Sequence, residues 1–158
     1  MRKIESFSVH HRNLKRGVYV SRRDYIGKEC VTTFDVRMKE PNWDIPIEPK
    51  VQHTIEHLAA TYLRNDKDYS DKVVYWGPMG CMTGSYLIMK GNLKPEQIIP
   101  LLTSMFDYIS EATKIPGEDP DECGNCKFHD LFGAKYEAKR FLKDVLLRGN
   151  TPTEYPAE

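Results

Sequence analysis

The sequence predicts an α+β fold, with a mainly antiparallel sheet of four strands and helices packed on one face. Two observations lead to this prediction. Four short segments have the β-branched and aromatic composition of strands, and three longer segments repeat their apolar residues at helical spacing. Along the chain they follow the order strand, strand, helix, strand, strand, helix, helix. Strands that follow one another in pairs favour antiparallel hairpins, and helices that cover such a sheet are typical of the α+β class.

The four predicted strands are rich in Val, Ile, Thr and aromatic residues, and they span residues 17–26, 30–38, 72–78 and 82–90. In the second strand, the odd-numbered residues from Val31 to Arg37 alternate with the even-numbered residues from Thr32 to Val36. Alternate residues of a strand point to opposite faces of a sheet. The third and fourth strands are separated by GPMGC, whose Gly and Pro residues favour a turn.

Helical periodicity marks three segments, which span residues 47–66, the region from Pro95 to Ile109, and residues 134–147. In the first segment, Val51, Ile55 and Leu58 lie on one apolar side that continues to Tyr62. Pro95 suits the first turn of a helix, where the missing N–H is not needed. A loop rich in Pro, Gly and acidic residues, KIPGEDPDECGNC, separates the last two helices.

Length and composition predict one domain over residues 1–149 and a flexible tail over residues 150–158, because a chain of 158 residues can bury a core of its own. Basic and acidic residues both number 23, and this zero formal charge argues against a basic face for nucleic acid. No apolar run approaches the roughly 20 residues that cross a bilayer. We therefore expect a cytoplasmic protein whose partner is neither nucleic acid nor a membrane.

The four cysteines are expected to be reduced in that compartment, which favours metal binding or catalysis over disulfides. Cys30 lies in a predicted strand, where a lone cysteine is most often a small buried apolar residue. The remaining three, Cys81, Cys123 and Cys126, lie in predicted turns and loops and are the candidates for chemistry.

The stretch HTIEH places two histidines on one side of the first predicted helix. His53 and His57 lie one turn apart, so both imidazoles can reach one cation. The apolar side of the helix lies nearly opposite. Glu56 projects beside the histidines, in the order H-x-x-E-H that inverted zinc peptidases use for two ligands and a general base. A third ligand is then needed, and either Cys123 or Cys126 of ECGNC can supply it.

Three alternatives stay open on these residues alone. The histidine pair can be incidental on a solvated helix face, with Glu56 an ordinary exposed carboxylate. A metallopeptidase would use Glu56 to activate water and would need a carboxylate ligand further along the chain, which gives Cys81 and Cys123 no task. A non-enzymatic module would hold its metal through four protein ligands and would unfold when the metal is removed.

Five motifs follow one another along nearly the whole chain: ESF, FDVR, IEPKVQHTIEHL, PMGCMTGSYL and ECGNCKFHDLFGAK. Together they resemble one bacterial family, the S-ribosylhomocysteine lyases, often called LuxS. The resemblance implies cleavage of the thioether of S-ribosylhomocysteine by carbonyl migration and β-elimination. The products would be homocysteine and 4,5-dihydroxy-2,3-pentanedione, the precursor of the quorum-sensing signal autoinducer-2. The resemblance also implies a homodimer whose active sites lie at the subunit interface.

The resemblance implies a metal site as well. His53, His57 and Cys123 correspond to the ligands of one divalent metal per chain, iron(II) with zinc or cobalt as substitutes, and water would be the fourth ligand. Cys126 then has no role in the family. His129 fits two interpretations equally, as a neighbour that supports the metal ligands or as a surface or helix-capping residue.

For catalysis, the resemblance implies that Cys81 is the catalytic cysteine and Glu56 the second acid or base. Residues that approach the substrate from the partner subunit correspond to Ser6, His11 and Arg37. A thiolate at Cys81 would need a positive charge nearby to stabilise it, which Arg37 and the metal can provide.

Two positions depart from the family pattern. The chain has Tyr75-Trp76-Gly77 before PMGC, where the family commonly has Asp-Ile-Ser, so an acidic residue near the homocysteine end of the substrate is missing. Lys39 stands where a cysteine often follows the FDVR arginine by two residues. Neither departure touches the expected metal ligands or the acid/base pair, so we expect an effect on substrate affinity alone.

Overall fold

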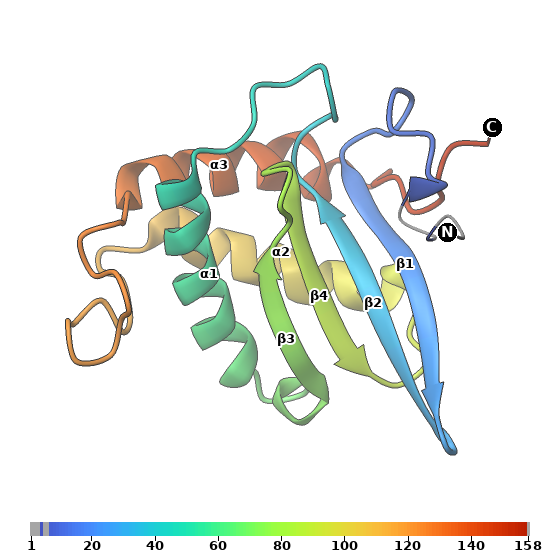
Figure 1. The fold of residues 1–158 in the computed structure, drawn as a ribbon, viewed down its shortest axis with the longest axis horizontal. Coiled ribbons are helices and arrows are strands. Elements are labelled where there is room, and N and C mark those ends of the chain that lie inside the picture. Colours follow the sequence, from blue (N-terminus) through green and yellow to red (C-terminus); the bar gives the residue numbers. More distant parts are fainter. Residues whose placement is uncertain (1–3, 5–6, 158) are drawn as a thin grey trace.

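The computed structural model describes residue 4 and residues 7–157, and it confirms an α+β fold (Figure 1). Its main elements are β1 (Gly17–Ile26), β2 (Glu29–Arg37), α1 (Pro49–Arg64), β3 (Val73–Pro78), β4 (Gly84–Lys90), α2 (Pro95–Glu111) and α3 (Leu131–Asp144). Short 3₁₀ helices follow α1 and α3: η2 (Ser70–Lys72) and η3 (Leu146–Arg148). Within the described part of the chain, no helix combines the length and the apolar character needed to cross a bilayer.

The four strands form one antiparallel sheet in the order β1-β2-β4-β3, so two hairpins lie side by side with β2 paired to β4. In Figure 1, α2 and α3 lie behind the sheet and α1 lies beside β3. The pairing places Arg37 opposite Gly84, at the end of the sheet where the β3–β4 turn carries Cys81. Gln52 of α1 reaches the same end of the sheet, because its Nε2 donates to the Gly84 oxygen at 3.1 Å.

One hydrophobic core joins the sheet to all three helices. The apolar side predicted for α1 is confirmed, and Ile55 at its centre is fully buried. The alternation predicted for β2 is also confirmed, since Phe34 and Val36 are fully buried in the core. Asp35 and Arg37, on the opposite face of the strand, are buried as well. Two charged residues are thus covered on the face of the sheet that turns away from the core.

The boundaries of α3 differ from those predicted, because the helix begins at Leu131 and ends at Asp144 instead of spanning residues 134–147. The early start has a local cause: the Asp130 carboxylate accepts a hydrogen bond from the backbone N–H of Gly133 at 2.8 Å and caps the helix. After α3 the chain tightens into η3 and turns at Gly149, whose φ of 75° suits glycine.

The described residues after Gly149 run back along the start of β1. The backbone N–H of Val18 donates to the Pro152 oxygen at 2.9 Å, which ties this segment to the sheet. β1 itself is irregular between Val20 and Arg22, where a bulge leaves Ser21 out of the pairing. The flexibility expected for residues 150–158 stays a prediction.

Candidate functional site

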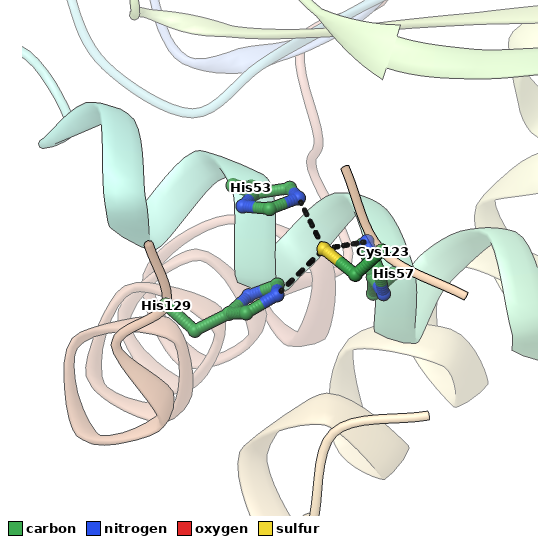
Figure 2. Close-up of side chains that lie close together, drawn as sticks. All are labelled: His53, His57, Cys123 and His129. Carbon is green, nitrogen blue, oxygen red and sulfur yellow. Dashed lines mark hydrogen bonds between the residues drawn. The ribbon is translucent and has the colours of Figure 1, made fainter. Parts of the chain in front are cut away.

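Two histidines of α1 and two residues from the loop before α3 converge on one point (Figure 2). The Cys123 sulfur lies between three imidazoles, 3.7 Å from Nε2 of His53, 3.9 Å from Nε2 of His57 and 3.6 Å from Nε2 of His129. All four ligand atoms lie within 4.8 Å of one another. The structure therefore brings together the three ligands implied by the resemblance and adds His129, whereas Cys126 is not a member of the group.

The two histidines of α1 are each fixed through the ring nitrogen that points away from this group. His53 Nδ1 lies 2.7 Å from the backbone oxygen of Phe128, and His57 Nδ1 lies 2.8 Å from that of Pro116. A carbonyl oxygen only accepts hydrogen bonds, so both Nδ1 atoms must carry the proton. Each Nε2 atom is left with a free lone pair that faces the Cys123 sulfur.

His129 is held in a similar way by a hydroxyl group. Thr54 Oγ1 donates its proton to the Lys50 oxygen at 2.9 Å, so it can accept a hydrogen bond from His129 Nδ1 at 3.1 Å. Burial and the neighbouring rings of His53 and His57 lower the pKa of His129, so the ring is neutral near pH 7. The only signal for this residue in the sequence is its position six residues after Cys123, which does not distinguish a ligand from a surface histidine.

The geometry and chemistry of the group fit a divalent metal ion. With metal–nitrogen bonds of about 2.0 Å and a metal–sulfur bond of about 2.3 Å, a tetrahedral ion separates nitrogen from sulfur by about 3.5 Å. The observed sulfur–nitrogen distances run from 3.6 to 3.9 Å. The Cys123 sulfur also accepts a hydrogen bond from the backbone N–H of Asn125 at 3.4 Å, which helps to fix its position. Imidazole and thiolate ligands suit zinc, iron(II) and cobalt alike, so they do not select one metal.

Glu56 lies at the rim of the metal group. Its Oε2 atom is 3.8 Å from Nε2 of His57, and its side chain is 33% exposed. A carboxylate in this position can reach a molecule bound at the group and can exchange protons with solvent.

Cys81 belongs to a second group of residues, at the β3–β4 turn. Its sulfur lies 3.0 Å from Thr83 Oγ1 and 3.8 Å from Nη1 of Arg37. Arg37 is fixed in turn, because Nε and Nη2 donate to the Asp35 carboxylate at 3.0 and 2.6 Å, and Nη1 donates to Thr83 Oγ1 at 2.6 Å. A guanidinium beside sulfur favours the thiolate form. Cys81 is exposed, so this thiol is accessible for chemistry.

Cys81 is one of the residues that line a pocket of about 260 Å³. The wall includes His11, as the resemblance implied, and its Nδ1 lies 2.8 Å from the Val9 oxygen. Tyr155, from the C-terminal segment, lines the same pocket. Ser6, the remaining expected substrate contact, lies outside the described residues.

The structure separates the predicted site residues into two parts within one chain. Glu56 and the metal group form the first part, and Cys81, Arg37 and His11 form the second. The pocket is lined by no residue of the metal group, and no hydrogen bond between described side chains links Cys81 to that group. His11 and Arg37, which the resemblance assigned to the partner subunit, thus share their pocket with the Cys81 of their own chain.

The two departures from the family pattern have structural positions outside this pocket. Lys39 Nζ forms a largely buried ion pair with Glu137 Oε2 at 2.7 Å, which joins the end of β2 to α3. Trp76 is a core residue, and the phenol of Tyr75 lies so close over Gly77 that a Cβ atom there would collide with it.

Comparison with known proteins agrees with the motifs. The profile of the family described as S-Ribosylhomocysteinase (LuxS) matches residues 4–151. A Porphyromonas gingivalis protein named S-ribosylhomocysteine lyase is 54% identical over 147 residues, which are 92% of each chain. Proteins of the same name from Phocaeicola vulgatus and Borreliella afzelii are 53% and 45% identical, over 92% and 90% of this chain and over 91% and 92% of theirs. The chain belongs to the LuxS family of S-ribosylhomocysteinases.

Proposed function

We propose that the protein cleaves the thioether of S-ribosylhomocysteine and yields homocysteine and 4,5-dihydroxy-2,3-pentanedione. As a member of the S-ribosylhomocysteinase family, it is an enzyme of the lyase class. The observation that carries the proposal is the convergence of three imidazoles and one thiol on one point, with the Glu56 carboxylate at the rim. A peptidase would add a carboxylate to the ligands, and this group contains none.

In this proposal His53, His57 and Cys123 hold one divalent metal, iron(II) with zinc or cobalt as substitutes. When bound there, such an ion would supply Lewis-acid chemistry that can stabilise negative charge on sugar oxygens. His129 belongs to the same group, where the resemblance implied water as the fourth ligand, so it would have to move aside to leave a position open for substrate. This ring is held less firmly than the other two, because its Nδ1 hydrogen bond is the longest of the three and ends on a hydroxyl.

The carbonyl group of the sugar must move before the carbon–sulfur bond can break. The bond at C5 belongs to an unactivated thioether, and the C4 proton becomes acidic only when a carbonyl stands at C3. Migration from C1 to C3 takes a proton from C2 to C1 and then another from C3 to C2. We assign these transfers to the Cys81 sulfur and the Glu56 carboxylate, both of which are accessible and can accept and return a proton.

Elimination then follows from the position of the carbonyl. Glu56 removes the C4 proton, the electrons of that bond form the C4–C5 double bond, and the C5–S bond breaks to release homocysteine thiolate. The resulting enol takes up a proton at C5 and becomes the dione. Atoms and charges balance without an oxidant or a reductant.

We assign the complete site to a homodimer, in which one chain supplies the metal group with Glu56 and the other supplies Cys81, Arg37 and His11. The separation of these two parts within one chain supports the assignment. Exposed aromatic side chains also lie in and after the metal-binding loop: Phe128 (43% exposed), Phe132 (83%) and Tyr136 (55%). A second copy would bury this apolar surface.

Incubation of metal-loaded protein with S-ribosylhomocysteine and a thiol reagent tests the proposed activity. We expect one thiol to be released for each substrate molecule consumed. This activity should be lost when the metal is removed and should return when the metal is restored. A folded, metal-loaded protein that releases no thiol would contradict the proposal and favour a closed structural metal site.

A further inference from the structure

The C-terminal segment packs against the sheet beside the Cys81 pocket. Besides the hydrogen bond from Val18 to Pro152, Thr151 Oγ1 donates to the Val145 oxygen at 3.1 Å. A Cβ atom at Gly17 would collide with the Pro152 carbonyl, so this glycine allows the segment to approach β1 closely. Figure 1 shows the C-terminus at the end of the molecule where β1 begins. This path places Tyr155 against β1 and β2.

Tyr155 makes two specific contacts there. Its ring stacks on that of Tyr19 of β1, with ring centroids 4.8 Å apart and planes 10° from parallel. Its hydroxyl donates to Oδ2 of Asp35 at 2.9 Å. Burial, followed by the nearby Asp35 carboxylate, raises the pKa of Tyr155 well above its usual range, so the phenol stays protonated and remains a donor.

The contacts of Asp35 continue from Tyr155 to the catalytic thiol. The Asp35 carboxylate is only 3% exposed, and it accepts hydrogen bonds from the phenol and from two nitrogens of Arg37. The third guanidinium nitrogen, Nη1, faces the Cys81 sulfur. A buried carboxylate needs all of its donors, so the loss of one changes how it holds the others.

We propose that Tyr155 is a positioning residue that holds the Asp35–Arg37 pair in the orientation that directs Arg37 at the Cys81 sulfur. The proposal deepens the proposed function, because it rests on Cys81 as the reacting thiol. The four residues form an unbroken series of contacts across three segments of the chain: the C-terminal segment, β2 and the β3–β4 turn.

The charged groups around Cys81 explain how the hydroxyl of Tyr155 can affect ionisation of the Cys81 thiol. The ionisable side chains that line the pocket around Cys81 are His11, Asp35, Arg37, Tyr86 and Tyr155. Burial and the Asp35 carboxylate raise the pKa of Tyr86, so this phenol is neutral too. Arg37 is the one permanent cation among these lining residues, and Asp35 opposes its effect on the sulfur. A hydrogen bond from Tyr155 disperses the negative charge of Asp35 and leaves more of the guanidinium field for a thiolate.

Alkylation of Cys81 by iodoacetamide, followed by peptide mass spectrometry across a range of pH, tests this inference without substrate. In Tyr155→Phe the ring and its stack stay while the hydroxyl is lost. We expect the pH midpoint of Cys81 alkylation to rise by about half a unit, which slows the reaction about threefold below the midpoint. The plateau rate at high pH should stay the same, because access to the sulfur is unchanged. Tyr155→Ala, which also removes the stack, should shift the midpoint at least as far.

Tyr19→Phe is the matched control, because it removes a phenol from the same stack that donates to the Lys15 oxygen and not to Asp35. Its midpoint should equal that of the parent. An unchanged midpoint in both Tyr155 variants, or an equal shift in Tyr19→Phe, would overturn the inference. Because the readout needs no turnover, it stands even if the parent fails to cleave S-ribosylhomocysteine.

Discussion

At the scale of single residues, backbone atoms decide which nitrogen each histidine of α1 offers to a metal. The carbonyl oxygens of Phe128 and Pro116 hold the Nδ1 protons of His53 and His57, so neither ring can turn its free nitrogen elsewhere without losing a hydrogen bond. The backbone N–H of Asn125 donates to the Cys123 sulfur and so helps to fix the orientation of that side chain. Such supporting partners fix ligand orientation, and their loss commonly weakens metal binding by about 10- to 100-fold.

Cysteine replacements test the ligand assignment directly. Cys123→Ala should lose most of its bound metal, because it removes the atom that all three imidazoles face. Cys126→Ala should keep a full complement of one ion per chain, since Cys126 lies outside the ligand group. Elemental analysis of both purified variants decides between them. The opposite pattern would show that the other cysteine of ECGNC is the ligand.

His129 should behave as a replaceable fourth ligand. His129→Ala should still bind one metal, with weaker affinity, because three ligands remain. When cobalt(II) is bound, its visible absorption spectrum should change between parent and His129→Ala, since the spectrum reports the ligand set. His53→Ala, the control, should lose most of the metal. An identical cobalt spectrum in parent and His129→Ala would show that His129 is not a ligand.

At the scale of the elements, the N-terminus of α3 positions the loop that carries Cys123 and His129, two members of the proposed metal group. The Asp130 side chain caps the helix, and its backbone N–H donates to Thr54 Oγ1 of α1 at 2.8 Å. That hydroxyl also holds His129. Asp130 therefore joins the end of the loop to both α1 and α3 beside the metal group.

Loss of this cap should cost stability. Asp130→Ala should lower the free energy of unfolding by about 1 kcal/mol, the usual cost of an N-cap replacement. Asp130→Asn should recover most of it, because an amide oxygen can still accept the Gly133 N–H. Urea denaturation of the three proteins measures both effects. Equal stability of Asp130→Ala and the parent would mean that the loop holds the helix end without the cap.

Periodicity and composition predicted the strands and helices well, because these signals are local. The start of α3 was missed because its cap, Asp130, lies between the acidic loop KIPGEDPDECGNC and the periodic segment, and Gly133 in the first turn is a poor helix former. The histidine pair could be found because a helix fixes the spacing of His53 and His57. His129 and Tyr155 could not be placed, since their roles depend on contacts between segments far apart in the sequence, such as Tyr155 with Asp35.

At the scale of the whole molecule, the separation of the two groups of proposed reacting residues is the reason why we propose that a subunit interface forms part of the active site. Glu56 and the metal group lie on α1 and the loop before α3, whereas Arg37 lies at the end of β2 and Cys81 in the β3–β4 turn beside it. A homodimer would bring each group against the other group of its partner. Each site then depends on both chains.

Mixed dimers test this arrangement. An Arg37→Ala chain mixed with a Glu56→Ala chain should regain part of the activity, because one of the two hybrid sites is intact. Arg37→Ala mixed with Cys81→Ala should regain none, since both changes fall in the same part of each site. Thiol release before and after verified subunit exchange measures both. No recovery in the first mixture would place the whole site within a single chain.

The separation of Cys81 from the metal group gives the most direct test of the proposed reaction. Thiol release from S-ribosylhomocysteine should be measured for metal-loaded Cys81→Ala beside the metal-loaded parent. The variant should keep its fold and its full metal content, because Cys81 is no member of the ligand group. It should lose nearly all thiol release, because a methyl group can neither accept nor return a proton. Turnover close to the parent rate, with the metal in place, would contradict the mechanism.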